Sequence, residues 1–374
     1  MTDLSGLFDP DRVAVIGATD REGSVGRALL ENLRTFDGEV VPVNPNRETV
    51  LDADCYPTIG SVPSPTGVDL AVVAVPAAVA VDVVGQVGEQ GIETVVVITA
   101  GFSETDDEGQ RRERALAAVA AEYDLDLVGP NSVGVISTAT GLNGTFLQGR
   151  PPEGSLSLMS QSGAFIAAVI GWATQHNIGF NNVVSLGNET VLDEVDFIEY
   201  WGDDPGTDVI LGYLEDIESG REFIDAAREV TQDTPIVVVK SGRTEAGASA
   251  ASSHTGAIAG SERAYEAGLK QAGVIRAESV QELFDAASVL ADQPRPDSSE
   301  VAIVTNAGGP GVMTTDAVGD TSLSLADFED ATLEALEAEL PDGANIYNPV
   351  DIIGDAPVER FETTLDTVLD DPNV

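Results

Sequence analysis

Short apolar runs alternate with longer amphipathic stretches over the first part of the chain. The apolar runs are rich in valine and bounded by glycine, proline or asparagine, which is typical of strands buried on both faces. The stretches between them have the spacing of helices with one apolar side. We therefore expect strands at 12–17, 39–43, 70–75, 94–99 and 126–128, and helices at 27–33, 77–90 and 108–123. Such an alternation predicts a parallel sheet with helices on both faces.

A second α/β pattern follows a loop rich in glycine, threonine and proline at 138–154. Its expected strands are 155–159, 182–185, 209–214 and 236–240, and its expected helices are 164–175, 192–201, 221–231 and 261–272. Beyond a linker at 293–299, one strand at 301–304 and a helix at 331–340 indicate a third unit with few strands. We therefore expect three α/β domains, at 1–140, 154–293 and 299–374, the last of them incomplete.

Three turns rich in small residues each join a strand to a helix, at 17–26, 160–164 and 305–312. A turn of this kind directs backbone N–H groups and the positive end of a helix dipole at one point, where an anion can bind. Each turn alone is equally typical of an ordinary strand-to-helix connection. Gly17, Gly23 and Gly26 are spaced more widely than in the GxGxxG fingerprint, and no GxxxxGK[ST] sequence occurs. A P-loop NTPase is therefore disfavoured, while three such turns in one chain favour phosphate chemistry.

His254 lies in a run of small residues that follows the expected strand at 236–240. A neutral imidazole is a nucleophile near neutral pH, so this side chain is a candidate covalent carrier, the alternative being a loop histidine without a role. Glu215 follows the strand at 209–214, where a carboxylate can orient an imidazole, the alternative being one of many solvated acids. The other histidine, His176, lies near a helix C-terminus, where it complements the dipole, and we interpret it as structural.

The charge balance is extreme, with 64 acidic against 18 basic residues and a net charge of −46. The acidic residues are dispersed through the α/β pattern, which argues against a disordered acidic tail. Self-repulsion of this size is tolerable under heavy screening, because the Debye length falls to about 3 Å at 1 M salt. We therefore expect a halophilic protein that has neither nucleic acid nor a membrane surface as a partner.

Cysteine content and hydropathy exclude several further classes of protein. A single cysteine, Cys55, excludes an internal disulfide framework and a multi-cysteine metal site, and we expect it to be a bystander. No apolar run approaches the roughly 20 residues that span a bilayer, and the polar N-terminus is not a signal peptide. We expect a cytoplasmic protein without a metal site of its own.

Four segments together carry a resemblance to a known family. They are Gly129-Pro130-Asn131, Ser160-Gln161-Ser162-Gly163, Lys240–Gly247 running into Ser252–Gly256, and Thr305–Gly311. Over its full length the chain resembles the α part of ADP-forming acetate–CoA ligases, which are nucleoside-diphosphate-forming acyl-CoA synthetases related to succinyl-CoA synthetase. The resemblance implies a Rossmann-like CoA-binding domain, then a flavodoxin-like α/β ligase domain with the histidine loop, and a partial third α/β domain.

The resemblance also implies a reaction. Acetyl-CoA and phosphate would give acetyl phosphate, and His254, positioned by Glu215, would take the phosphoryl group and pass it to ADP. The ATP-grasp part, which would bind ADP or ATP with Mg²⁺, is not found in this chain. We therefore expect a fused or separate ATP-grasp partner, and an oligomeric assembly.

Site residues follow from the same resemblance. The phosphoryl group would be held by Ser162, Gly163 and Ala164 and by Asn306, Gly308 and Gly309. CoA would lie near Gly17, Thr19, Ser24, Pro42, Val75, Pro76, Thr99, Gly101 and Asn131. The chain departs from the family at Ser132, where a cysteine often stands; since phosphate rather than a thiol does the chemistry, we expect little effect.

Two other functions compete with this interpretation. The first is a CoA-binding regulatory or acyltransferase-associated module without ligase turnover, which would need neither His254 nor Glu215. The second is an NAD-dependent oxidoreductase, which would have an acidic residue just after the second strand. The chain has Asn44-Pro45-Asn46 there, which disfavours the second alternative.

The charge balance generates a first prediction. Lowering KCl from multimolar to dilute buffer should cost the protein much of its secondary structure, because carboxylate repulsion is then no longer screened. Far-UV circular dichroism across a KCl series measures this. A spectrum that is unchanged in dilute buffer would contradict the halophilic interpretation.

Overall fold

The computed structural model describes residues 2–217, 219–242, 262–294, 296 and 298–374. His254 and the rest of the expected histidine loop lie outside these described residues. The described chain divides into two compact units, Met1–Gln293 and Pro294–Val374.

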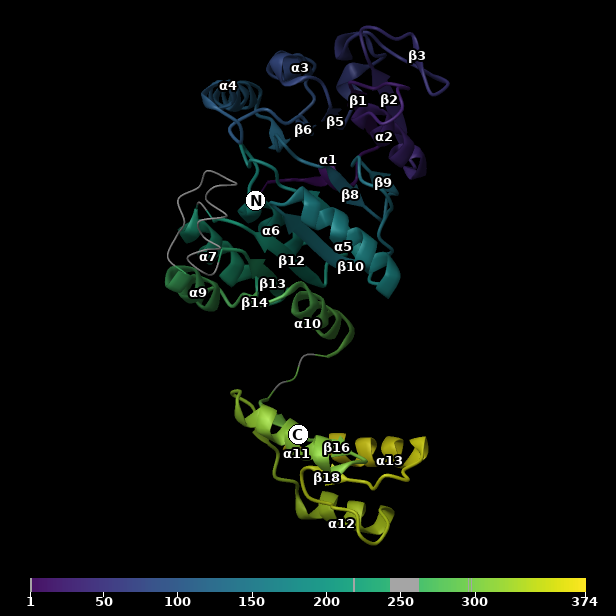
Figure 1. Ribbon diagram of the computed structural model, residues 1–374, viewed down its shortest axis with the longest axis vertical. Helices are drawn as coiled ribbons and strands as arrows, with labels where there is room; N and C mark the ends of the chain where they lie inside the picture. The colour runs from purple at the N-terminus through teal and green to yellow at the C-terminus, as the bar shows by residue number, and fades with distance from the viewer. Residues whose placement is uncertain (1, 218, 243–261, 295, 297) are drawn as a thin grey trace. The chain divides into compact units, whose positions relative to one another are not determined.

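The first sheet has five parallel strands in the order β2-β1-β5-β6-β7. Strands β2, β1, β5 and β6 are labelled in Figure 1. These strands are β1 (Arg12–Ile16), β2 (Glu39–Val43), β5 (Leu70–Val73), β6 (Thr94–Val97) and β7 (Asp126–Val128). The helices of this part are α1 (Ser5–Phe8), α2 (Val25–Asn32), α3 (Ala77–Glu89) and α4 (Asp107–Tyr123). A small hairpin of β3 (Thr49–Val50) and β4 (Ala53–Asp54) and the 3-10 turns η1 (Leu33–Thr35), η2 (Ile59–Ser61) and η3 (Pro65–Gly67) complete it. The predicted parallel sheet is confirmed, with small shifts at the ends of its elements.

Side chains alternate across this sheet because successive residues of a strand point to opposite faces. Val13 and Val15 of β1 belong to one apolar cluster, and Ala14 and Ile16 belong to another. The second cluster includes apolar side chains of α3 and α4, which therefore cover that face.

The second sheet has seven strands in the order β14-β13-β12-β10-β11-β8-β9. They are β8 (Val135–Ser137), β9 (Leu142–Asn143), β10 (Glu153–Ser160), β11 (Phe180–Ser185), β12 (Val209–Leu214), β13 (Ile236–Lys240) and β14 (Ile275–Arg276). Its helices are α5 (Gly163–His176), α6 (Glu194–Gly202), α7 (Gly220–Val230), α9 (Glu262–Gln271) and α10 (Val280–Asp292). Strands β10 to β14 are parallel; the sequence predicted β10 to β13, whereas β14 was not expected.

Strands β8 and β9 lie elsewhere than their position in the sequence indicated. Residues 135–140 were assigned to the first domain, with a loop at 138–154 ending it. In the structure β8 pairs antiparallel with β11, and β9 pairs antiparallel with β8, so both belong to the second sheet. Two short strands in a segment rich in glycine and threonine give little periodic signal, and a pattern of strands and helices predicts parallel neighbours only.

One apolar cluster joins the two sheets into a single unit. It contains Val13 and Val15 of β1 together with Met159 of β10 and Val184 of β11. Between the sheets, the ring of Phe8 on α1 stacks on Tyr200 and lies 6.3 Å from the ring of Phe197, both on α6.

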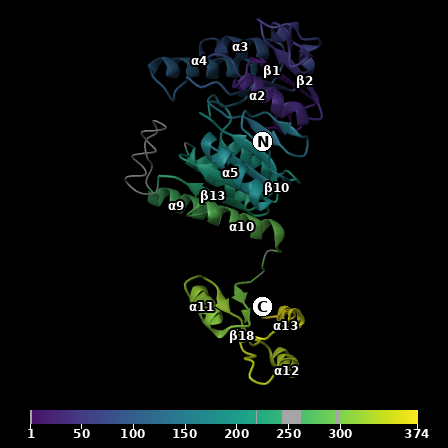
Figure 2. The same cartoon turned by 45° about the vertical axis from the view of Figure 1, so that its right-hand side comes forward.

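The opposite face of the second sheet is covered by α5 and α10. Leu158 of β10 and Leu211 of β12 form an apolar cluster there with side chains of both helices. Helix α10 contacts β13 and lies next to it in Figure 2.

The second unit has a small core and four two-residue strands. Its strands are β15 (Glu300–Val301), β16 (Val304–Thr305), β17 (Ser324–Leu325) and β18 (Val350–Asp351), and its helices are α11 (Gly308–Gly319), α12 (Asp330–Glu339) and α13 (Val358–Leu369). The single strand expected at 301–304 is divided, because β15 pairs with β17 and β16 pairs with β18. Between them the Asn348 amide takes the place of a strand partner: it donates to the Val301 carbonyl at 2.8 Å and accepts from the Ile303 N–H at 3.0 Å.

A group of carboxylates gathers at the start of β7. Burial, and then the like charges of its neighbours, raise the pKa of Asp126 from its ordinary 3.8 to about 6. These neighbours are Asp196, Asp124, Glu93 and Asp3. A raised pKa means that the folded state binds the proton of Asp126 more tightly than the unfolded chain does. The contribution that protonated Asp126 makes to the free energy of unfolding is therefore complete below about pH 4. This contribution is lost as the pH rises through about 6.

Asp126→Asn should therefore stabilise the protein at pH 7 to 8 and should give no gain near pH 4. After discounting for solvent screening of this partly exposed group, we expect a gain of about 1 kcal/mol at the higher pH. Denaturant unfolding at both pH values and constant salt measures the difference. Asp82→Asn, an exposed change of the same charge on α3, is the matched control. Equal gains in both variants would refute a local effect at Asp126.

Candidate functional site

A cavity of about 680 Å³ opens at the carboxyl ends of β1, β2 and β5. The ends of parallel strands are where ligands bind in open α/β sheets. Its lining includes Ile16, Gly17, Thr19, Arg21, Val43, Asn44, Pro45, Asn46 and Arg47, and also Pro57, Thr58, Ile59, Ala74, Val75, Pro76, Val79, Val83 and Gln86. The cavity therefore has an apolar wall from β5 and α3 and a polar wall from the loops that follow β1 and β2.

Gly17 allows the turn after β1 to pass close to the end of β5. Its φ is +102°, and a Cβ atom there would lie 2.3 Å from the Ala74 carbonyl oxygen, so only glycine fits. Ser24 is the N-cap residue of α2, but its side chain does not cap the helix and donates instead to the Arg21 carbonyl at 2.6 Å. The first N–H groups of α2 are therefore available for an anion.

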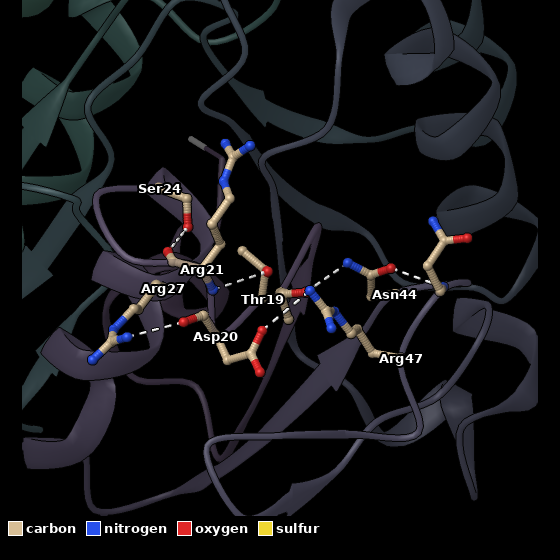
Figure 3. A network of polar contacts seen from close by, with 9 residues as sticks. Thr19, Asp20, Arg21, Ser24, Arg27, Asn44 and Arg47 are labelled. Carbon is tan, nitrogen blue, oxygen red and sulfur yellow. Dashed lines mark hydrogen bonds and ion pairs between the residues drawn. The ribbon is translucent and has the colours of Figure 1, made fainter.

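Two guanidinium groups, Arg21 and Arg47, line the polar wall (Figure 3). Arg47 pairs with the Asp20 carboxylate at 3.2 Å, and the Asp20 carbonyl accepts from Arg27 at 2.9 Å. In a chain with so few basic residues, their concentration here suits a ligand with several negative charges. Sequence reasoning missed both arginines, although each lies in a loop that follows a predicted strand.

Four of the nine expected CoA-binding residues line the cavity, and the other five do not. Gly17, Thr19, Val75 and Pro76 line the cavity. Pro42 lies inside β2, and Ser24 precedes α2. Thr99 lies behind the cavity wall, where its hydroxyl donates to the Val75 carbonyl at 2.7 Å. Gly101 follows β6 and Asn131 follows β7.

Asn188, in the loop after β11, links Gly101 and Asn131 to the second sheet. Its side-chain oxygen accepts from Asn131 at 3.3 Å, and its nitrogen lies 2.8 Å from carboxylate oxygens of both Glu104 and Glu113. Glu104 in turn accepts from the Gly101 N–H at 2.5 Å. Burial raises the pKa of Glu104, but the hydrogen bonds from Asn188 and backbone N–H groups outweigh it and lower the pKa. The ends of β6 and β11 are thereby held together.

Ser132, at the family's cysteine position, has a structural role. Its buried hydroxyl donates to the Ser185 carbonyl at 2.6 Å and accepts from the Gly134 N–H at 2.9 Å. Both of its hydrogen-bonding functions are therefore used within the protein.

The 160–164 turn leads from β10 into α5 and contains three of the expected phosphate-binding residues. Ser162 is the N-cap, and its hydroxyl accepts from the Phe165 N–H at 3.4 Å. Gly163 begins the helix, and a Cβ atom there would lie 2.5 Å from Cγ1 of Val133. Ala164 follows in the first turn. This geometry presents the positive end of α5 to an anion.

Glu215 lies beside this turn because β10 and β12 are parallel neighbours. Ser160 pairs with Tyr213, so both strands end at the same edge. The side-chain oxygen of Gln161 accepts from the Glu215 N–H at 2.5 Å. On the other side of Glu215, the Lys240 ammonium donates to its carbonyl at 2.6 Å. The structure thus brings Glu215 and the 160–164 turn together, whereas His254 lies outside the described residues.

Lys240 is buried, with 6% of its surface exposed, and it is held by carbonyls and a ring. Besides Glu215 it donates to the Ser241 carbonyl at 2.9 Å, and its ammonium lies 4.3 Å from the centre of the Tyr265 ring. The Tyr265 hydroxyl donates to the Asp216 carboxylate. Burial lowers the pKa of Lys240 and raises that of Tyr265.

The remaining phosphate-site candidates belong to the second unit. Helix α11 begins at Gly308, next to Gly309, and its N-cap residue Ala307 has no side-chain cap. The Thr305 hydroxyl accepts from the Ala307 N–H at 3.1 Å, which shapes the turn that contains Asn306. This turn therefore has an open helix N-terminus within its own unit.

Neither a metal cluster nor a membrane span is found in the part of the chain that the structure describes. There, no three His, Cys, Asp or Glu side chains are grouped so that they could hold a metal ion. Among the same residues, no helix is both long and apolar enough to cross a bilayer.

Comparison with known domain families defines the class of the chain. Residues 11–138 match a CoA binding domain, residues 153–290 match a succinyl-CoA ligase like flavodoxin domain, and residues 301–374 match a ligase-CoA domain. The fold and these domains are those found in CoA ligases of the succinyl-CoA synthetase type.

Individual relatives define the family. Acetate–CoA ligase (ADP-forming) I of Archaeoglobus fulgidus is 47% identical over 368 residues, which cover 98% of this chain and 53% of that protein. The α subunit of acetate–CoA ligase (ADP-forming) II of Pyrococcus furiosus is 40% identical, with 99% of this chain and 80% of the subunit covered. The chain belongs to the ADP-forming acetate–CoA ligase family, in its α-type part. It spans about half the length of the first curated relatives that it matches.

A solved structure agrees with the fold. The dinucleotide-forming acetyl-coenzyme A synthetase 1 of Ca. Korarchaeum cryptofilum, in complex with phosphate and ADP, has a TM-score of 0.94 at 38% identity. The similarity covers all of this chain and 81% of that one. The predicted α/β class, with its CoA-binding, flavodoxin-like and further domains, is thereby confirmed.

Proposed function

We propose that this chain is the α part of an ADP-forming acyl-CoA synthetase that uses acetyl-CoA. The observation that carries this proposal is the Glu215 loop bound to the N-terminal turn of α5, in the same unit as a cavity with cationic groups. In the first step a phosphate oxygen attacks the thioester carbonyl, the C–S bond breaks, and CoA leaves as acetyl phosphate forms. In the second step an imidazole nitrogen of His254 attacks phosphorus, the P–O bond to the acetyl group breaks, and acetate leaves.

The described residues supply binding and electrostatics for these steps. The N–H groups of Gly163 and Ala164 and the dipole of α5 stabilise the charge on the transferring phosphoryl group. The Glu215 carboxylate accepts the second imidazole N–H of His254, which fixes the tautomer and stabilises the ring as it becomes positive. Arg21 and Arg47 bind the phosphates of CoA, and the apolar wall of the cavity holds its adenosine.

The third step transfers the phosphoryl group from His254 to ADP. We propose that an ATP-grasp part, fused or separate, supplies ADP with Mg²⁺, and that Asn306, Gly308 and Gly309 hold the phosphoryl group from a second helix N-terminus. A relative named as an α subunit supports such a partner. The charge balance favours a cytoplasmic enzyme of a halophile, working as an oligomer with its partner.

Arg47→Ala should weaken CoA binding about tenfold, because a charge-assisted hydrogen bond to phosphate is worth roughly 1.5–3 kcal/mol. Isothermal titration calorimetry with CoA at constant KCl measures the change. Arg221→Ala, whose side chain on α7 is 90% exposed, removes the same charge away from the cavity and should leave the Kd unchanged. Equal weakening in both variants would refute the assignment, and so would a wild-type chain that does not bind CoA.

Acetyl-CoA and ³²P-labelled phosphate should label the protein with base-stable, acid-labile phosphate. His254→Ala should abolish the label, Glu215→Gln should slow labelling about tenfold, and His176→Ala should leave it intact. The measurement is filter-bound radioactivity after alkaline and acid washes. Label that survives in His254→Ala would overturn the carrier assignment, and CoA binding without any labelling would favour the regulatory module instead.

A further inference from the structure

We propose that Gln161 is a positioning residue that fixes Glu215 against the 160–164 turn by joining three strand-end loops through one side-chain amide. This role deepens the proposed function and rests on it. Gln161 follows β10, and the loops that it joins follow β11 and β12.

The amide of Gln161 uses both of its ends. Its oxygen accepts from the N–H groups of Glu215 at 2.5 Å and Asp216 at 3.1 Å. Its nitrogen lies 3.0 and 2.9 Å from the two carboxylate oxygens of Glu189 and 3.1 Å from the Asp216 carbonyl. The backbone N–H of Gln161 also donates to the Tyr213 carbonyl at 3.1 Å. Gln161 is thus fixed at its main chain and at its side chain.

Only an amide of this length meets both demands. The loop after β12 presents N–H donors and needs an acceptor at position 161, and the contact with the Glu189 carboxylate needs a donor at that position. Glutamate at position 161 would satisfy the first demand but would place a second carboxylate against Glu189. The loop that carries Glu189 has its own constraint, because φ of Glu189 is 55°, in the left-handed region that non-glycine residues rarely adopt.

Gln161 binds the backbone beyond the last pair of residues in the ladder between β10 and β12. The ladder between β10 and β12 reaches Ser160 and Tyr213, and Glu215 lies just beyond the end of β12. At Glu215 the N–H is held by Gln161 and the carbonyl by Lys240, so its backbone is fixed on both sides. These two contacts fix the point on the main chain from which its side chain extends.

The Gln161 amide therefore connects the proposed phosphate-binding turn with the residue proposed to position the histidine. It precedes Ser162 and Gly163 directly in the chain, and it holds the backbone of Glu215 across the sheet edge. Its loss should leave the strands paired but should misplace the Glu215 carboxylate relative to the N-terminus of α5.

The test uses Gln161→Glu, Glu189→Gln and the double variant that exchanges the two side chains, all in the full chain. In the exchanged pair, the carboxylate at position 161 still accepts from the Glu215 loop, and the amide at position 189 donates to that carboxylate. Only the donation to the Asp216 carbonyl is not restored. Gln175→Glu, an exposed glutamine near the end of α5, is the matched control for the added charge. The readouts are the initial rate of base-stable labelling from acetyl-CoA and ³²P-phosphate, the Kd for CoA, and the Tm.

We expect Gln161→Glu to slow labelling about tenfold with an unchanged Kd for CoA, and the exchanged pair to recover most of the rate. A labelled wild type with an equally labelled Gln161→Glu variant would overturn the positioning role alone. A rate loss that the exchanged pair does not recover, while its Tm returns to that of wild type, would overturn the role as well. A wild type without label, or label that persists in His254→Ala, would overturn the proposed function and this role with it.

Discussion

The parallel register of β10, β12 and β13 is the constraint on which the candidate phosphate site depends. Ser160 pairs with Tyr213, and Leu214 pairs with Lys240, so the three strands end at one edge of the sheet. Where a strand ends, its backbone N–H and C=O groups lose their ladder partners and must be satisfied in another way. Here the side chains of Gln161 and Lys240 satisfy them, and in doing so they determine the position of Glu215.

Much of this arrangement could be predicted from the sequence, because it follows from periodicity and from the rule that ligands bind at strand ends. The parallel strands, the small-residue turn before α5 and the position of Glu215 at the end of β12 all follow from local patterns. What could not be predicted depends on pairs of residues that are distant in the chain. Gln161 is an ordinary polar residue in a turn, and its partners lie 28, 54 and 55 positions away. Strand β8 was missed for a similar reason, since its antiparallel partner β11 comes later in the sequence, and β9 joins the sheet only through β8.

The few basic side chains of this acidic chain differ in how they are bound. With 64 acidic residues, a basic side chain can find a carboxylate almost anywhere, and exposed pairs of this kind stabilise little. Lys240 behaves differently: it is buried, and its ammonium donates to two carbonyls and lies over an aromatic ring. Arg47 also differs from these exposed pairs, because it lines the cavity at the carboxyl ends of β1, β2 and β5 while it pairs with Asp20.

Salt explains why an amide suits the position of Gln161 better than an ion pair would. Charge pairs near the surface weaken as ionic strength rises, and at about 1 M salt the screening length is only about 3 Å. A hydrogen bond between a neutral amide and backbone N–H groups depends on short-range geometry and changes much less with salt. At high ionic strength, a site aligned by amide and backbone contacts keeps its geometry, whereas one aligned by exposed ion pairs loosens. The contacts of Gln161 and Lys240 with the backbone of Glu215 are of the salt-tolerant kind, and the ion pairs of Arg12, Arg27 and Arg112 with partly exposed acids lie outside this site.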